Sequence, residues 1–150
     1  GRPSEEARIR DLLEDAASLA EKRNVEGFIE LLAPDYKDFE GRDKAGTAQL
    51  VTDYLSRYRG VVIHVLGLHP GVIEPDGRAD VECEVCLSHG AAEALRQLIR
   101  FSGEYYRFRL GLRKDGAGKW RFASAEWVSI GLPDLFPESL PILRKLFPEF

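Results

Sequence analysis

The chain of 150 residues contains no methionine, two cysteines and three histidines. No apolar run approaches the roughly 20 residues that a membrane-spanning helix needs, and no signal-peptide core is present. An excess of positive charge is also missing. The formal net charge is -4, which argues against broad nucleic-acid binding because such binding needs a basic surface. The remaining composition, 44% hydrophobic and 31% charged, is typical of one globular domain.

The chain starts at Gly1 instead of a methionine. Removal of an export signal or of a lipid-anchor signal would explain the missing initiator. We therefore expect a periplasmic or envelope-associated protein, with a cytoplasmic location as the alternative. We expect no membrane span within the chain itself.

The two cysteines, Cys83 and Cys86, have a C-x-x-C spacing within "VECEVCLSH". A redox or metal motif of this kind is expected at a turn or a helix start, whereas this stretch alternates like a strand. Residues three apart in a strand point to opposite faces, with Cα atoms about 10 Å apart, which is too far for a disulfide. We therefore predict two separate, structural cysteines.

Neither a cofactor nor a metal site is predicted. The histidines do not occur at metal-ligand spacing, and the acidic cluster between Asp35 and Asp43 lacks the pattern of a calcium loop. The sequence also contains no glycine-rich phosphate loop and no nucleophile elbow.

Three helices are predicted in the first sixty residues from hydrophobic periodicity. Ser4, Asn24 and Asp43 are good N-cap residues, and each directly precedes an apolar stripe. The first helix is expected over residues 4–23, the second stops before Pro34, and the third stops at Gly60. The residues of the third helix that are expected to point inward are Leu50, Val51, Tyr54, Leu55 and Tyr58.

After Gly60 the hydrophobic period changes to two, which indicates strands. A short strand is expected near residues 35–40, and longer ones over 61–74, 79–89, 98–113 and 119–130. The predicted fold class is α+β, with three N-terminal helices followed by a long antiparallel sheet. We expect residues 1–130 to form this domain and residues 131–150 to form an apolar tail.

The element order, together with "DYKDFEGRDKAG" and "KWRFASAEW", resembles the nuclear transport factor 2-like superfamily, whose cone-shaped fold is that of polyketide cyclases and ketosteroid isomerases. The stretches "IHVLGL" and "GEYYRFRLGL" are similar to uncharacterised bacterial envelope proteins within it. The resemblance covers residues 4–130. It implies that the three helices pack on a curved antiparallel sheet that forms a cone, with a cavity between the sheet and the helices. It also implies pairing of two protomers through their sheets. Members include isomerases, dehydratases and domains of unknown role, so the resemblance does not fix an activity.

The strand register decides which side chains line the cone. A tight turn at residues 114–118 would place Trp120 opposite Leu112 and Glu126 opposite Tyr106. The turn "EPDGRA" would place His64 on the same inner face. The short strand adds Tyr36 and Asp38. The predicted ligand-pocket residues are Tyr36, Glu104, Phe108, Trp120, Phe122 and Ser124.

Three functions fit this cone. The first is a non-catalytic, envelope-associated domain whose cavity binds a small apolar or amphipathic ligand. The second is a cofactor-free lyase or isomerase that uses Glu126 or Asp38 as general base, with Tyr106 and His64 orienting the substrate. Against this reading, Glu126 or Glu104 would be a structural carboxylate tied to an arginine or a backbone amide. The third is an interaction module whose cone is plugged by side chains and whose tail makes the dimer.

Two features of the sequence bear on possible partners, a row of arginines on the outer face of the sheet and the apolar tail. Arg107, Arg109 and Arg113 alternate along one strand, and we expect Glu82 and Glu84 to pair with them on a solvated face. The tail is too apolar to leave in water, so it packs either on its own domain or on a partner chain. The family resemblance, in which sheet faces pair two protomers, implies a homodimer.

Overall fold

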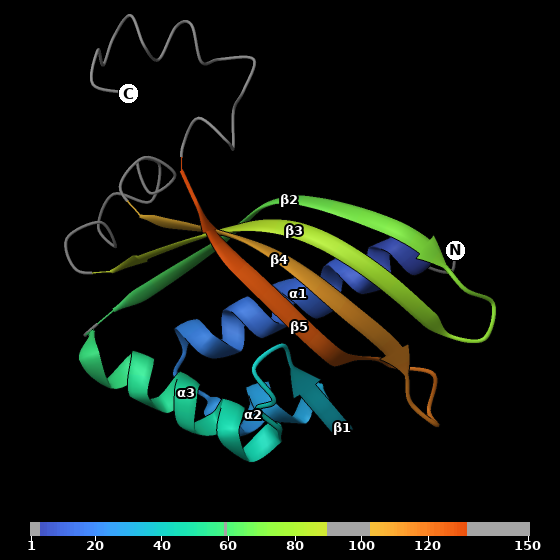
Figure 1. Cartoon of the computed structure of the whole chain (residues 1–150), viewed down its shortest axis with the longest axis horizontal. Coiled ribbons are helices and arrows are strands. Elements are labelled where there is room, and N and C mark those ends of the chain that lie inside the picture. The colour runs from blue at the N-terminus through green and yellow to red at the C-terminus, as the bar shows by residue number, and fades with distance from the viewer. Residues whose placement is uncertain (1–3, 59, 90–102, 132–150) are drawn as a thin grey trace, which may run out of the picture.

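A computed structural model describes residues 4–58, 60–89 and 103–131 of this chain. Within these residues, three helices and a short strand precede four long strands, as Figure 1 shows. The helices are α1 (Glu5–Glu21), α2 (Val25–Glu30) and α3 (Lys44–Arg57). The strands are β1 (Leu32–Asp38), β2 (Val61–Ile73), β3 (Arg78–His89), β4 (Glu104–Lys114) and β5 (Trp120–Ile130).

Each helix begins at the N-cap residue that the sequence predicts. The side chains of Ser4, Asn24 and Asp43 accept hydrogen bonds from backbone N–H groups of the first turn, at 3.1, 2.9 and 2.9 Å. The ends differ slightly from prediction, because α1 stops at Glu21 and α3 at Arg57. None of the described helices combines the length and the apolar character required of a membrane span.

The sheet is mixed, which corrects the expectation of an antiparallel one. Its strand order is β1-β5-β4-β3-β2, and β1 pairs with β5 in parallel while all other pairs are antiparallel. All three helices lie on one side of the curved sheet, which gives the α+β cone (Figure 1). The predicted apolar tail, except for Gly131, lies outside the described residues.

A β-bulge in β5 changes the predicted register of the last hairpin. Leu112 pairs with Phe122, whereas the adjacent Gly111 pairs with Ser124, so Ala123 is an extra residue on β5. Gly111 permits this close approach, because a Cβ there would collide with the Ser124 hydroxyl. The bulge reverses which side chains of β5 face the helices.

The register of β2 also differs from prediction. Val65 pairs with Val85 and Ile63 with Leu87, so the odd-numbered residues at the start of β2 face the helices. His64 therefore lies on the opposite face, which corrects its expected position in the cone. The register of β2 against β3 shifts between Val65 and Gly67 and again between Pro70 and Ile73.

The main core lies between α1 and the concave face of the sheet. It includes Ile9 and Leu13 from the helix and Val81 and Leu110 from the strands. A second buried cluster lies on the opposite face of the sheet around Val62, Cys86 and Tyr105. The two cysteines are free and fall into different clusters, as predicted from their spacing.

Candidate functional site

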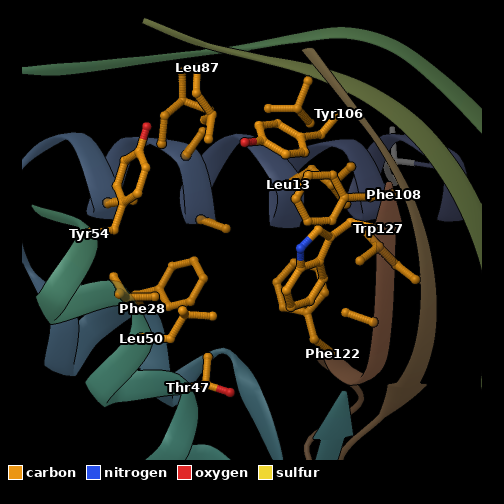
Figure 2. A pocket seen from close by; sticks show the side chains of 18 of the residues that line it. Leu13, Phe28, Thr47, Leu50, Tyr54, Leu87, Tyr106, Phe108, Phe122 and Trp127 are labelled. Atoms are coloured by element: carbon orange, nitrogen blue, oxygen red, sulfur yellow. The ribbon is translucent and has the colours of Figure 1, made fainter. Parts of the chain in front are cut away.

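A cavity of about 480 Å³ opens between the concave face of the sheet and the three helices. Its wall is mostly aliphatic and aromatic, as Figure 2 shows. The volume falls within the roughly 300–1,000 Å³ that is typical of small-molecule sites. Among the predicted residues, those that line it are Tyr36, Tyr106, Phe108 and Phe122.

Helix α3 provides one wall of the cavity because its inward residues repeat at helical spacing. Thr47, Leu50, Val51, Tyr54 and Leu55 all line it, and four of these five are inward positions that the sequence predicts. Thr47 and Tyr54 are separated by two helical turns, which is about 10 Å along the axis. Their hydroxyls thus mark two separate heights of the same wall (Figure 2).

Tyrosines form one end of the cavity. The Tyr54 hydroxyl is buried and has no hydrogen-bond partner among the described residues. The Tyr106 hydroxyl donates to Glu104 Oε2 at 2.9 Å. Figure 2 shows both hydroxyls at the same end of the cavity, near Leu87. Burial, reinforced by the charge of Glu104, raises the pKa of Tyr54 to about 12, and burial also raises the pKa of Tyr106.

An ion-paired turn forms another part of the rim. Arg42 and Glu40 line the cavity, and the Arg42 guanidinium contacts Asp38 Oδ2 at 2.8 Å and Glu40 Oε2 at 3.2 Å. Asp38 Oδ1 accepts from the backbone N–H groups of Glu40 and Arg42, each at 2.9 Å. Burial opposes ionisation of Asp38, but these hydrogen bonds outweigh it and hold its pKa below the usual value. Asp38 is therefore an ionised structural carboxylate.

Two predicted positions in the cone are wrong because of the β5 bulge. Glu126 lies on the outer face, half exposed, and its Oε1 contacts Arg109 Nη1 at 3.1 Å. Ser124 is exposed and does not belong to the cavity wall. The bulge turns Ala125 and Trp127 inward instead. Arg109 also contacts Glu82 at 3.1 Å, which is one of the outer-face pairs that the sequence predicts.

Three more predicted residues do not line the cavity. Trp120 is buried in the core and donates its indole N–H to Glu5 Oε2 at 2.7 Å. Glu104 is exposed at the rim, where it accepts from Tyr106. His64 is on the far face of the sheet, and its buried Nε2 has no hydrogen-bond partner among the described residues.

Sequence reasoning missed two features of the wall. Trp127 lines the cavity, packs edge-on against Phe39 with ring centroids 4.8 Å apart, and lies beneath the Arg42 guanidinium at 6.0 Å. The sequence signal for Trp127 was the apolar pattern of β5, in which the inward-facing residues change from even-numbered to odd-numbered positions at Ala123. The inward-facing Thr47 was also missed, although it lies three residues before Leu50 on the predicted stripe.

The described wall suits binding better than acid–base chemistry. Its polar groups include four hydroxyls, and Glu40 is its single acidic member among the described residues. That carboxylate is paired with Arg42. Burial raises the pKa of the Cys83 thiol to about 12, so this wall residue is not an activated nucleophile.

No family model matches the chain, and neither does any curated protein. Solved structures do share its fold. An NTF2-like protein of unknown function, PA1314 from Pseudomonas aeruginosa, has a TM-score of 0.67 at 15% identity, covering 83% of this chain and 99% of PA1314. A protein provisionally named scytalone dehydratase, from Novosphingobium aromaticivorans, has a TM-score of 0.68 at 14% identity, covering 83% of each chain.

A third structure, Bd1075 from Bdellovibrio bacteriovorus, has a TM-score of 0.64 at 12% identity. It is matched over 83% of this chain, which spans only 40% of the length of Bd1075. At these identities the likeness shows the fold alone. The fold is therefore that of the NTF2-like, cystatin-like proteins.

Proposed function

We propose that this chain binds one small apolar or amphipathic molecule in the cavity between α3 and the sheet, without changing it chemically. The observation that supports this most directly is a largely apolar cavity of about 480 Å³ that the described side chains leave open. Each methylene group that such a molecule moves from water into the cavity contributes about 0.8 kcal/mol. The open space also argues against a cone plugged by its own side chains.

The alternative, a cofactor-free lyase or isomerase, needs a carboxylate beside the substrate as general base. Glu126 faces the outside of the sheet, and Asp38 is held ionised by Arg42 and by backbone N–H groups. Both residues have partners that suit structural roles. Binding therefore ranks ahead of catalysis as the proposed function.

The location and the assembly rest on the resemblance and on the apolar tail. We retain an envelope-associated location and a homodimer as parts of the proposal. Light scattering on the purified full chain tests the dimer directly. A single monomeric species at micromolar concentration would contradict it.

The binding proposal is tested with N-phenyl-1-naphthylamine, a neutral apolar probe that fluoresces when it leaves water. We expect the unmodified protein to bind it, and Val51→Phe to weaken binding at least about tenfold because the larger ring fills the cavity. Val128→Phe is the matched control, since Val128 is 59% exposed on β5. Equal binding by both variants, or no binding by the unmodified protein, would contradict the proposal.

A further inference from the structure

The tyrosine end of the cavity has a hydrogen-bonding group that the described protein leaves unused. The Tyr54 hydroxyl is buried without a partner, and such a group costs about 1–3 kcal/mol when it stays unpaired. Tyr106, whose hydroxyl lies at the same end of the cavity, already donates to Glu104 (Figure 2). A ligand group placed between the two hydroxyls would complete the network.

The chemistry of that ligand group follows from counting donors and acceptors. A tyrosine hydroxyl has one proton to donate, and a carboxylate can only accept. The Tyr106 proton is committed to Glu104 Oε2 at 2.9 Å, so the Tyr106 oxygen is left as an acceptor. The Tyr54 hydroxyl is able to donate as well as to accept. A group that both donates and accepts fits this pair.

Charge at this end excludes an anion. Glu104 is exposed at the rim and places its carboxylate beside the Tyr106 hydroxyl. Burial keeps Tyr54 and Tyr106 in their neutral, protonated form, so neither supplies a charge that could pair with an anion. Arg42 is the single cationic member of the described wall, and it is already paired with Asp38 and Glu40. A carboxylate at the tyrosine end would meet repulsion without a compensating cation.

We infer that the ligand ends in a hydroxyl group, which donates to the Tyr106 oxygen and accepts from the Tyr54 hydroxyl. The cavity therefore selects an apolar alcohol over a carboxylate or an ether of the same length. This inference rests on the proposed binding function and assigns the polar end of its ligand.

The test compares three probes with the same ten-carbon chain: 1-decanol, decyl methyl ether and decanoate. Each competes with N-phenyl-1-naphthylamine for the full-length protein at neutral pH. We expect 1-decanol to bind about tenfold more tightly than the ether, because the ether keeps an acceptor oxygen but has lost the donor. Decanoate should bind most weakly. Equal affinities for the alcohol and the ether, or tighter binding of decanoate, would overturn the inference.

Two variants probe the residues that set this preference. Tyr106→Phe removes the acceptor oxygen, and we expect it to weaken binding of 1-decanol about tenfold while leaving the ether unchanged. Glu104→Gln removes the charge and frees Tyr106 to donate, so decanoate should gain affinity and the preference for the alcohol over the ether should shrink. Glu126→Gln is the matched control, because Glu126 lies on the outer face beside Arg109. It should leave the ranking of probes unchanged.

The outcomes separate this inference from the proposed function. If neither the fluorescent probe nor any ten-carbon compound binds, the binding function itself is wrong. If the compounds bind but Tyr106→Phe and Glu104→Gln leave their relative affinities unchanged, the binding function stands and the assignment of a hydroxyl end fails. Circular dichroism of each variant shows that a loss of binding does not come from unfolding.

Discussion

The turn that joins β1 to α3 and the inner face of α3 are adjacent in the chain, yet their polar groups differ in kind. In the turn, Asp38 accepts from two backbone N–H groups and from the Arg42 guanidinium, and Asp43 caps the helix. On the inner face of α3, the buried hydroxyls of Thr47 and Tyr54 have no hydrogen-bond partner among the described residues. The Tyr36 hydroxyl approaches Thr47 without forming a hydrogen bond of acceptable geometry.

This difference separates polar groups that hold the fold from polar groups that are open to a ligand. A buried carboxylate with three donors is already satisfied and has little to offer a bound molecule. An unpaired buried hydroxyl weakens the empty protein and strengthens a complex that supplies its partner. Substitutions in the turn should therefore lower mainly the stability of the protein, whereas substitutions on the inner face of α3 should lower mainly its affinity for a ligand.

The largest expected effect is in the turn. Asp38→Ala removes three accepted hydrogen bonds and leaves the Arg42 guanidinium without its shorter ion pair. We expect the free energy of unfolding to fall by about 2–3 kcal/mol, measured by urea denaturation. Arg78→Ala is the control, since the pair between Arg78 and Asp76 is exposed and should contribute less than about 1 kcal/mol. Equal losses in both variants would remove the distinction between the two regions.

A smaller effect depends on pH. The folded-state pKa of Asp38 is below the unfolded value of about 3.8, so its stabilisation is present above that pH and is lost as the pH falls through the folded value. Asp38→Asn keeps the acceptor oxygen but removes the charge. We expect it to cost about 1 kcal/mol at pH 7 and progressively less as the pH falls below about 3.8. A constant difference between the two proteins from pH 7 to pH 2.5 would contradict this assignment.

The smallest effect on stability is expected on α3. Tyr54→Phe removes a buried hydroxyl that has no described partner, so the free energy of unfolding should stay the same or rise by up to about 1 kcal/mol. The same variant should bind 1-decanol more weakly than the unmodified protein does. Thermal unfolding measures the expected change in stability, and displacement of the fluorescent probe measures the expected loss of affinity for 1-decanol. A clear loss of stability would mean that the Tyr54 hydroxyl already has a partner within the protein.

Local features of the fold were predictable from the sequence. Ser4, Asn24 and Asp43 mark the starts of the helices because N-capping is a contact between residues only a few positions apart. The inward stripe of α3 was equally readable, since a period of 3.6 residues is a property of the helix itself. The separation of Cys83 and Cys86 onto opposite faces followed from the alternation of a strand.

Which residues line the cavity depended on the register of each strand against its neighbour. The observed hairpin pairs Lys114 with Trp120, which shifts the predicted register by two residues and preserves the inward face. The single extra residue at Ala123 then reverses that face, which sends Glu126 outward and Trp127 inward. On β2 the observed register differs from the predicted one by an odd number of residues, which places His64 on the face away from the helices.

By itself, the sequence determined where helices begin and which residues alternate, because these depend on contacts between near neighbours. The order of its elements resembled that of an α+β cone. Only the tertiary structure decided which carboxylates and tyrosines share the cavity. Strand alternation has a period of two, so one inserted residue reverses every side chain that follows it. Here the extra residue lies opposite the step from Gly111 to Leu112, where the absence of a side chain on Gly111 leaves room for Ser124.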